Sequence, residues 1–245
     1  MSHLSLTDYD LARYDRQIML FGEEAQKRLK GAKVLVAGAG GLGSPLTTYL
    51  AVAGIGHIRV VDSDEVELSN LNRQILHWDE DEGKRKVESA LAKLRRMNPS
   101  ITVEALFEHI DEGNVEALVS DVDAIVDCMD NFPTRYLLNR AAIQRRIPLF
   151  HAAVYGLEAR VSTIVPGETA CLRCLFPTAP PAETFPVVGA APGLAATIQA
   201  MEVIKHFTGY GNLLKNRMLV FDGEASRFLD LTLQRDPRCP DCGHL

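Results

Sequence analysis

The sequence has no excess of positive charge and no long apolar run. Its 245 residues include 26 Lys and Arg against 32 Asp and Glu, which gives a net charge of -6. This balance argues against broad binding to nucleic acid or to anionic membranes. No apolar stretch approaches the ~20 residues of a membrane-spanning helix, and residues 1–8 lack the basic-then-apolar order of a signal peptide. We therefore expect a cytoplasmic protein with no nucleic-acid partner and no membrane partner.

The sequence also lacks the side-chain combinations of nucleophilic catalysis. No Ser-His-Asp or Cys-His arrangement is visible, and the seven histidines show no metal-ligand spacing. We expect His77, His109 and His151 to be packing or surface residues. The chemistry of this protein must therefore come from other residue types.

Cysteine is scarce, yet four of the five cysteines form two Cys-x-x-Cys pairs, Cys171/Cys174 and Cys239/Cys242. In a reducing compartment such pairs are more often thiolate metal ligands than disulfides. Four thiolates fill the tetrahedral coordination of a structural Zn²⁺ ion. A redox-active pair or two unrelated knuckles are the alternatives. The fifth residue, Cys128, lies in an apolar run and is expected to be a packed core thiol.

Apolar runs alternate with helix-compatible stretches and predict an α/β fold. Strands are expected at 33–37, 57–62, 102–107, 123–128 and 148–154. Helices are expected between them at 45–53, 84–97, 113–119 and 134–145. This alternation predicts a Rossmann-like, doubly wound and mostly parallel sheet covered on both faces.

We expect one domain, 1–245, with three parts. Residues 1–32 supply N-terminal helices, with a charged helical stretch over 7–30, and residues 33–155 form a nucleotide-binding core. Residues 156–245 form a zinc-stapled part in which strands at 160–165, 218–222 and 227–233 extend the sheet. A helix is expected from Leu194 to Phe207. Before it, 176–193 is proline-rich and is expected to be a long loop.

A glycine-rich loop follows the first predicted strand. It contains Gly38, Gly40, Gly41 and Gly43, it opens a helix, and the next strand ends at Asp62. Such a loop lets a phosphate approach a helix N-terminus, and the acid reaches a ribose hydroxyl. Asp64 and Glu65 are alternatives for the acid. Taken alone, the loop first suggests NAD or FAD.

Polar residues beyond the loop favour adenylyl or phosphoryl transfer over hydride transfer. Arg73 can grip a polyphosphate with two hydrogen bonds, and Lys86 supplies a compact charge, although Lys86 and its neighbours could also form a solvated helix face. Asp130, after the fourth strand, is placed to hold Mg²⁺ between phosphates. Arg135 could reach the same anion or lie on the surface. The polar cluster that contains Arg73 also supplies Asn70 and Gln74.

These residues make the sequence similar to the ubiquitin-activating-like adenylyltransferases, the family of the molybdopterin-synthase and thiamine sulfur-carrier enzymes. The resemblance covers nearly the full chain in the family's order. The matching segments are 13–17, 38–43, Asp62, 69–74, 84–88, 128–131 and both cysteine pairs. The resemblance implies that ATP and Mg²⁺ are used to adenylate the C-terminal glycine carboxylate of a small ubiquitin-like sulfur-carrier protein ending in Gly-Gly.

The resemblance also implies residue roles. Asn70, Arg73 and Lys86 contact the phosphates, Asp62 binds the ribose, and Asp130 holds magnesium. It further implies a homodimer whose active site is completed in trans.

In that homodimer, Arg16 enters the active site of the neighbouring subunit. One departure concerns the loop that crosses the active site in this family, here called the crossover loop (176–193). Many members carry a cysteine there, and this chain has none. We therefore expect the enzyme to stop at the acyl-adenylate and to rely on a separate sulfur donor.

Other functions stay open at this point. A family relative could adenylate a small-molecule or peptide carboxylate in a cofactor pathway. A nicotinamide-dependent oxidoreductase and a zinc-stapled binding module are alternatives from other classes. The residues do not distinguish the molybdopterin pathway from the thiamine pathway or from another one.

Overall fold

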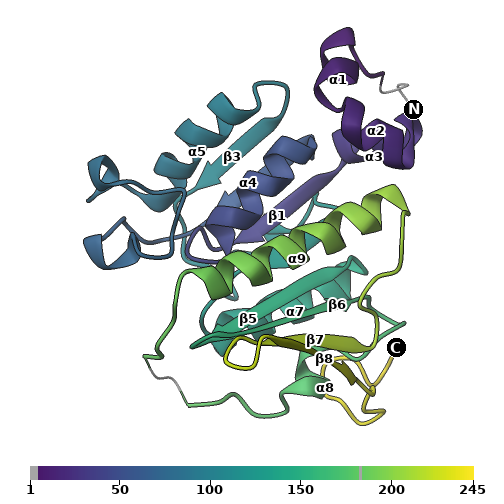
Figure 1. Ribbon diagram of the computed structural model, residues 1–245. Helices are drawn as coiled ribbons and strands as arrows, with labels where there is room; N and C mark the ends of the chain where they lie inside the picture. The colour runs from purple at the N-terminus through teal and green to yellow at the C-terminus, as the bar shows by residue number, and fades with distance from the viewer. Residues whose placement is uncertain (1–4, 182–183) are drawn as a thin grey trace.

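The fold is seen in a computed structural model that describes residues 5–181 and 184–245. Residues 1–4 of the predicted N-terminal part and residues 182–183 of the crossover loop lie outside the described residues. The described residues form one eight-stranded sheet in the order β3-β2-β1-β4-β5-β6-β7-β8 (Figure 1). The strands are β1 (Lys33–Ala37), β2 (His57–Val61), β3 (Thr102–Leu106), β4 (Ala124–Asp127), β5 (Leu149–Tyr155), β6 (Glu158–Ile164), β7 (Arg217–Asp222) and β8 (Arg227–Thr232).

The sheet is parallel in its first part and antiparallel in its last. The five neighbouring strands β3, β2, β1, β4 and β5 pair in parallel. From β5 through β6 and β7 to β8, the pairs are antiparallel. The direction changes at a tight turn between Tyr155 and Glu158, where Gly156 takes a left-handed φ of 59°. The predicted mostly parallel sheet with a C-terminal strand extension is confirmed.

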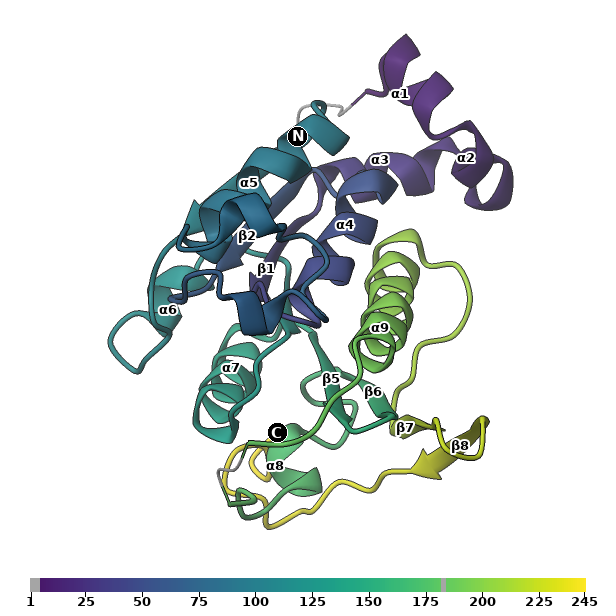
Figure 2. The same cartoon turned by 60° about the vertical axis from the view of Figure 1, so that its left-hand side comes forward.

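Helices cover both faces of the parallel part, as the central strand β1 shows. Val34 and Val36 pack on one face with α4 (Gly43–Ala53), α5 (Lys86–Met97) and α9 (Ala190–Thr208). Leu35 and Ala37 pack on the other with α6 (Val115–Leu118) and α7 (Phe132–Arg145). Because successive side chains of a strand point to opposite faces, a continuous apolar run is buried on both. Figure 2 shows α7 and α9 on opposite sides of the sheet.

The N-terminal helical stretch is divided into three helices, α1 (Asp8–Arg13), α2 (Asp15–Phe21) and α3 (Glu23–Gly31). The second break is at Gly22, whose φ of 81° lies outside the helical region. The first break is at Tyr14, whose side chain turns into the core and accepts a hydrogen bond from Asn98 Nδ2 at 2.8 Å. Burial of the Tyr14 side chain therefore interrupts the helix that the local sequence pattern predicts here.

Helix α9 begins at Ala190, whereas the sequence analysis expected Leu194. Pro192 misled that prediction, because it lies in the first turn of the helix, where a backbone N–H has no helical acceptor and proline is tolerated. The crossover loop therefore ends at Gly189. A Cβ on Gly189 would lie 2.4 Å from the Asn72 carbonyl oxygen, so glycine is required where α9 meets the polar segment 69–74.

The remaining differences are small. Helices α4, α5, α6 and α7 differ from the predicted ranges by one or two residues at their ends, which is the usual uncertainty of a helix boundary. Three short helices, α8 (Leu172–Leu175), η1 (Leu68–Asn70) and η2 (Asp79–Asp81), were not predicted from the sequence. Within 5–181 and 184–245, no helix is both long and apolar enough to span a lipid bilayer.

Candidate active site

The predicted nucleotide residues meet at the carboxyl ends of β2, β1 and β4. Since β1 lies between β2 and β4, the segments that follow these three strands are neighbours. The glycine loop (38–43) follows β1, Asp62 follows β2, and Asp130 comes shortly after β4. Open α/β sheets bind ligands at this edge, where successive connections leave in opposite directions.

The glycines of the loop are required for two different reasons. A Cβ on Gly38 would lie 2.7 Å from the Cys128 carbonyl oxygen, and one on Gly43 would lie 1.9 Å from the Gly38 carbonyl oxygen. Backbone packing therefore demands these two glycines. A Cβ on Gly40 or Gly41 would meet only side chains, no nearer than 3.4 Å. The N–H groups of Gly40 and Gly41 have no acceptor among the described residues, so a phosphate group can approach them.

Asp62 lies against the glycine loop. Its Oδ2 accepts a hydrogen bond from the Ala39 N–H at 2.7 Å, and its Oδ1 accepts one from the Asp64 N–H at 2.8 Å. Burial raises the pKa of Asp62, and the two amide donors only partly oppose that rise. Each carboxylate oxygen keeps a further lone pair, so the geometry fits the predicted contact with a ribose hydroxyl.

Lys86 is buried rather than solvated. It begins α5, only 5% of it is exposed, and its Nζ donates to the Asp64 carboxylate at 2.7 Å. Lys84 and Arg85 are exposed but precede α5, so this run does not form a solvated helix face. The sequence analysis treated Asp64 only as an alternative ribose ligand and missed its pairing with Lys86. Asp64 lies only two residues after Asp62 in the sequence, and this second acid was the signal that could have indicated the pairing.

Asn70 and Arg73 come from the segment at η1, on the same edge. The Asn70 side chain is buried and its Oδ1 accepts from the Glu67 N–H at 3.2 Å. Arg73 Nη1 donates to the Ser69 carbonyl at 2.9 Å and to Asn72 Oδ1 at 3.0 Å. The other N–H groups of this guanidinium have no acceptor among the described residues, which leaves them free for an anion.

Gln74 presents an unpaired acceptor beside the glycine loop. Only 4% of the residue is exposed, and its Oε1 has no hydrogen-bond partner in the described part of the chain. Its Nε2 would lie 3.6 Å from a Cβ on Gly40. Because a buried acceptor without a donor is unfavourable, this site suits a ligand that brings a donor group, as a nucleotide does.

Asp130 and Arg135 have contrasting environments. Asp130 is exposed and has no ion pair within 5–181 and 184–245, so its carboxylate fits the predicted magnesium ligand. Arg135 is buried: it donates to the carbonyls of Met129 and Ala152, and its Nε lies 3.5 Å from Asp127 Oδ2. The structure thus places Arg135 beneath the turn that carries Asp130. Asp127 was missed, although an acid inside an apolar strand is a visible signal.

Arg16 is not brought to the other predicted residues of its own chain. It is exposed on α2, and Tyr14 at the start of α2 packs against Gly54, which follows the C-terminal end of α4. The glycine loop lies at the opposite end of α4, whose 11 residues span about 16 Å.

The four paired cysteines form one cluster at α8. Their ligand atoms all lie within 4.8 Å of one another, and Sγ–Sγ distances include 3.6 Å for Cys171–Cys239 and 3.5 Å for Cys174–Cys242. A tetrahedral zinc ion with bonds of ~2.3 Å requires sulfur separations of about 3.8 Å. The Asp236 N–H also points at Cys174 Sγ, at 3.4 Å. The geometry and the donor set fit Zn²⁺.

Comparison with known proteins adds close relatives. A model of the ThiF family matches residues 14–241. The chain is 44% identical over 248 residues to the SAMP-activating enzyme E1 of Haloferax volcanii, with 98% of this chain and 92% of that protein covered. It is 41% identical over 250 residues to the sulfur carrier protein adenylyltransferase of Thermus thermophilus, with 97% and 92% covered.

Solved structures share the fold as well. A crystal structure of E. coli MccB with ATP superposes with a TM-score of 0.86 at 26% identity, covering 97% of this chain and 76% of that one. The structure of PaaA superposes with a TM-score of 0.83 at 27% identity, covering 95% and 76%.

Proposed function

The chain belongs to the ThiF family of ubiquitin-activating-like adenylyltransferases, as its motifs predicted, and from this premise we propose its reaction. It uses ATP and Mg²⁺ to adenylate the C-terminal glycine carboxylate of a small ubiquitin-like sulfur-carrier protein ending in Gly-Gly, and it releases pyrophosphate. The similarity to the SAMP-activating enzyme E1 of Haloferax and to the sulfur carrier protein adenylyltransferase of Thermus supports this acceptor. Membership of this family argues against a nicotinamide-dependent oxidoreductase, which the glycine loop alone suggests.

The observation that carries the proposal is the grouping of Arg73, Lys86 and Asp130 around the open glycines of the loop. In adenylation, a carboxylate attacks the α-phosphorus and the bond to pyrophosphate breaks, so negative charge passes from the carboxylate to the leaving pyrophosphate. Fixed positive groups are the main means of stabilising such charge. Arg73 has N–H groups without an acceptor among the described residues, and Lys86 is held at the site by Asp64.

Two further features of the site fit this chemistry. Magnesium, held by Asp130, would neutralise phosphate charge. No general base is needed, because a glycine carboxylate is already ionised near neutral pH. This agrees with the absence of a catalytic triad from the sequence.

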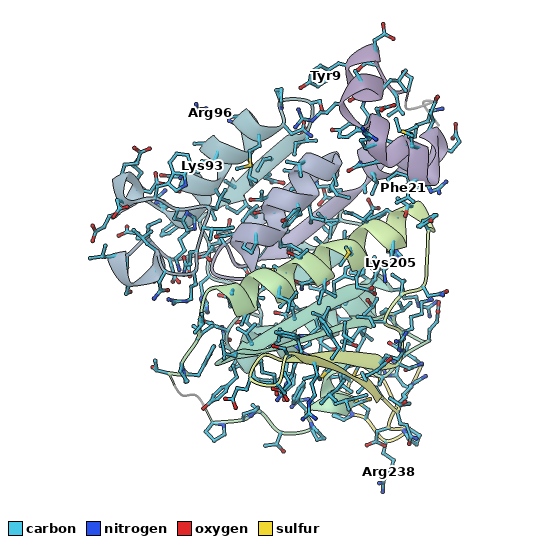
Figure 3. The ribbon with its side chains drawn as sticks, in the orientation of Figure 1. Tyr9, Phe21, Lys93, Arg96, Lys205 and Arg238 are labelled. Atoms are coloured by element: carbon cyan, nitrogen blue, oxygen red, sulfur yellow. The ribbon has the colours of Figure 1, made fainter. Side chains whose placement is uncertain are left out.

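We also propose a homodimer in which Arg16 completes the active site of the partner. Arg16 projects from α2, where Met19 and Leu20 are 72% and 58% exposed. Leu20 and Phe21 line an apolar groove of about 530 Å³ together with Met201 of α9, and Phe21 lies beside the end of α9 that carries Lys205 (Figure 3). Exposed apolar side chains that gather around one groove are typical of a surface that another protein covers.

A Zn²⁺ ion bound by Cys171, Cys174, Cys239 and Cys242 is structural, since four protein ligands leave no open coordination position. Catalysis ends at the acyl-adenylate, which a separate sulfur donor captures. Cys128 is a poor nucleophile because burial raises its pKa well above the usual value.

The crossover loop offers no better nucleophile. Its Thr184 is exposed and has no described base beside it that could activate the hydroxyl.

ATP–pyrophosphate exchange tests the proposed reaction, with a Gly-Gly-ended carrier and with the same carrier lacking its last glycine. Exchange should require the complete carrier. Arg73→Ala and Asp130→Ala should each slow exchange by at least about 10²-fold, the scale for removing one preorganised charge stabiliser. Lys86→Met should behave in the same way, and Lys84→Met, an exposed lysine in the same run, is the matched control. Exchange that proceeds equally with the truncated carrier would contradict the proposed acceptor.

A further inference from the structure

His77 joins three segments of the candidate site. Its side chain is buried, with Nε2 2.9 Å from the Ala39 carbonyl oxygen in the glycine loop and Nδ1 2.9 Å from Ser89 Oγ on α5. Its backbone N–H donates to the Gln74 carbonyl at 2.9 Å. The sequence analysis expected only a packing or surface residue here, but these contacts connect the glycine loop, the segment of Arg73 and the helix of Lys86.

The hydrogen bonds around His77 run in one direction. Lys93, labelled in Figure 3, donates to Ser89 Oγ at 2.8 Å and pairs with the buried Asp81. A carbonyl oxygen can only accept, so the ring proton of His77 is on Nε2, facing the Ala39 carbonyl. Nδ1 of the neutral ring is then the acceptor for the Ser89 hydroxyl. Burial lowers the pKa of His77, which favours this neutral ring.

The backbone N–H and carbonyl groups of Ala39 are both held by hydrogen bonds. Its N–H donates to Asp62 Oδ2 at 2.7 Å, and its carbonyl accepts from His77 Nε2 and from Ser44 Oγ, the latter at 3.1 Å. The Ala39 carbonyl and the Gly40 N–H belong to one planar trans peptide and point in opposite directions. Holding the carbonyl toward His77 therefore aims the Gly40 N–H away from His77, as a donor without an acceptor among the described residues.

We propose that His77 is a positioning residue for nucleotide binding: through the Ala39–Gly40 peptide it aims the Gly40 N–H at the phosphates of ATP. This inference rests on the proposed function, because it requires ATP in the glycine loop. His77 touches no reacting atom. The contact that it arranges is made to bound ATP before and during the reaction, so its loss weakens ATP binding rather than the chemical step alone.

Calorimetric titration of the full-length protein with ATP and Mg²⁺ tests the proposal, since it reports affinity and binding stoichiometry separately and needs no carrier. His77→Leu should raise the Kd for ATP by about three- to ten-fold, the scale of one hydrogen bond, at unchanged stoichiometry. His77→Gln keeps an N–H donor near the position of Nε2 and should restore a Kd close to that of the wild-type protein. His109→Gln, at an exposed histidine, is the control.

The outcomes separate the inference from the proposed function. A wild-type protein that does not bind ATP would contradict both. Wild-type binding with an unchanged Kd in His77→Leu would overturn only the role of His77. A merely structural role would lower the stoichiometry through partial unfolding and leave the Kd unchanged. If His77→Leu does not fold, Ser89→Ala decides: it should raise the Kd by about two- to three-fold, and an unchanged value would overturn the proposal.

Discussion

His151 Nδ1 lies 2.7 Å from Asp127 Oδ2, and neither side chain is exposed to solvent. Burial opposes the charge of Asp127, but the Arg135 guanidinium and the hydrogen bond from His151 outweigh it and lower the pKa of this carboxyl group. Asp127 Oδ1 also accepts from the Met129 N–H at 3.0 Å. The buried group therefore supports the turn that leads to Asp130, the candidate magnesium ligand.

Asp127→Asn should destabilise the protein by about 3 to 5 kcal/mol, because it leaves the buried Arg135 without a compensating charge. Asp121→Asn is the matched control. Asp121 also pairs with an arginine, at 2.8 Å from Arg59, but its side chain is 53% exposed. Surface pairs contribute less than about 1 kcal/mol. Urea unfolding of both variants measures the difference, and equal losses would contradict the role assigned to burial.

The free energy of unfolding should fall as the pH drops below about 6.5. Burial is the main cause that lowers the pKa of His77, His151 and His206. The unfolded chain then takes up protons at these residues at a pH where the folded protein keeps them neutral, so acidification favours unfolding.

Each group contributes up to about 1.4 kcal/mol per pH unit, between its ordinary pKa and its lower value in the folded protein. Urea unfolding from about pH 7.5 to about pH 5.5 measures the slope. The exposed His109→Gln variant should show the slope of the wild-type protein. Constant or rising stability on acidification would contradict the prediction.

The parallel core was predictable because its signals are local. The apolar runs of β1 and β4 and the glycines between β1 and α4 each specify one backbone conformation, whatever lies around them. The order of those strands then follows from general rules for α/β sheets. This is why the positions of Asp62 and Asp130 at one edge could be predicted from the sequence.

The parts that were not predictable depend on contacts between distant residues. Arg135 is one helical turn beyond Asn131, and its sequence position alone cannot show that it turns inward to Asp127. The pairing of Lys86 with Asp64 and the contact of His77 with Ala39 likewise join residues that are far apart in the chain. Tertiary burial decided each of these positions, against the local pattern.

Loss of the proposed zinc ion should lower stability and leave the chemistry of the nucleotide site in place. Cys174→Ser and Cys242→Ser should reduce metal content and Tm together, because each removes one of four ligands. Cys128→Ser, at a cysteine outside the cluster, should keep the full metal content. Metal analysis and thermal unfolding measure both effects. An unchanged Tm with lost activity after chelation would make the site catalytic instead.

Arg16 and Asp130 should complement each other between subunits. In the proposed homodimer, a site uses its own Asp130 and the partner's Arg16, so Arg16→Ala and Asp130→Ala each inactivate both sites of a pure dimer. When the two variants are mixed equally and exchange subunits at random, half of the dimers are mixed, and each has one intact site. About a quarter of wild-type exchange activity should then return.

Subunit exchange is verified with differently tagged chains, and a mixture of Arg73→Ala with Asp130→Ala is the control. Those two residues belong to the same site, so random exchange leaves each site of the mixed dimer with one defect and restores no activity. No rescue by Arg16→Ala, with mixed dimers present, would place Arg16 outside the partner's site.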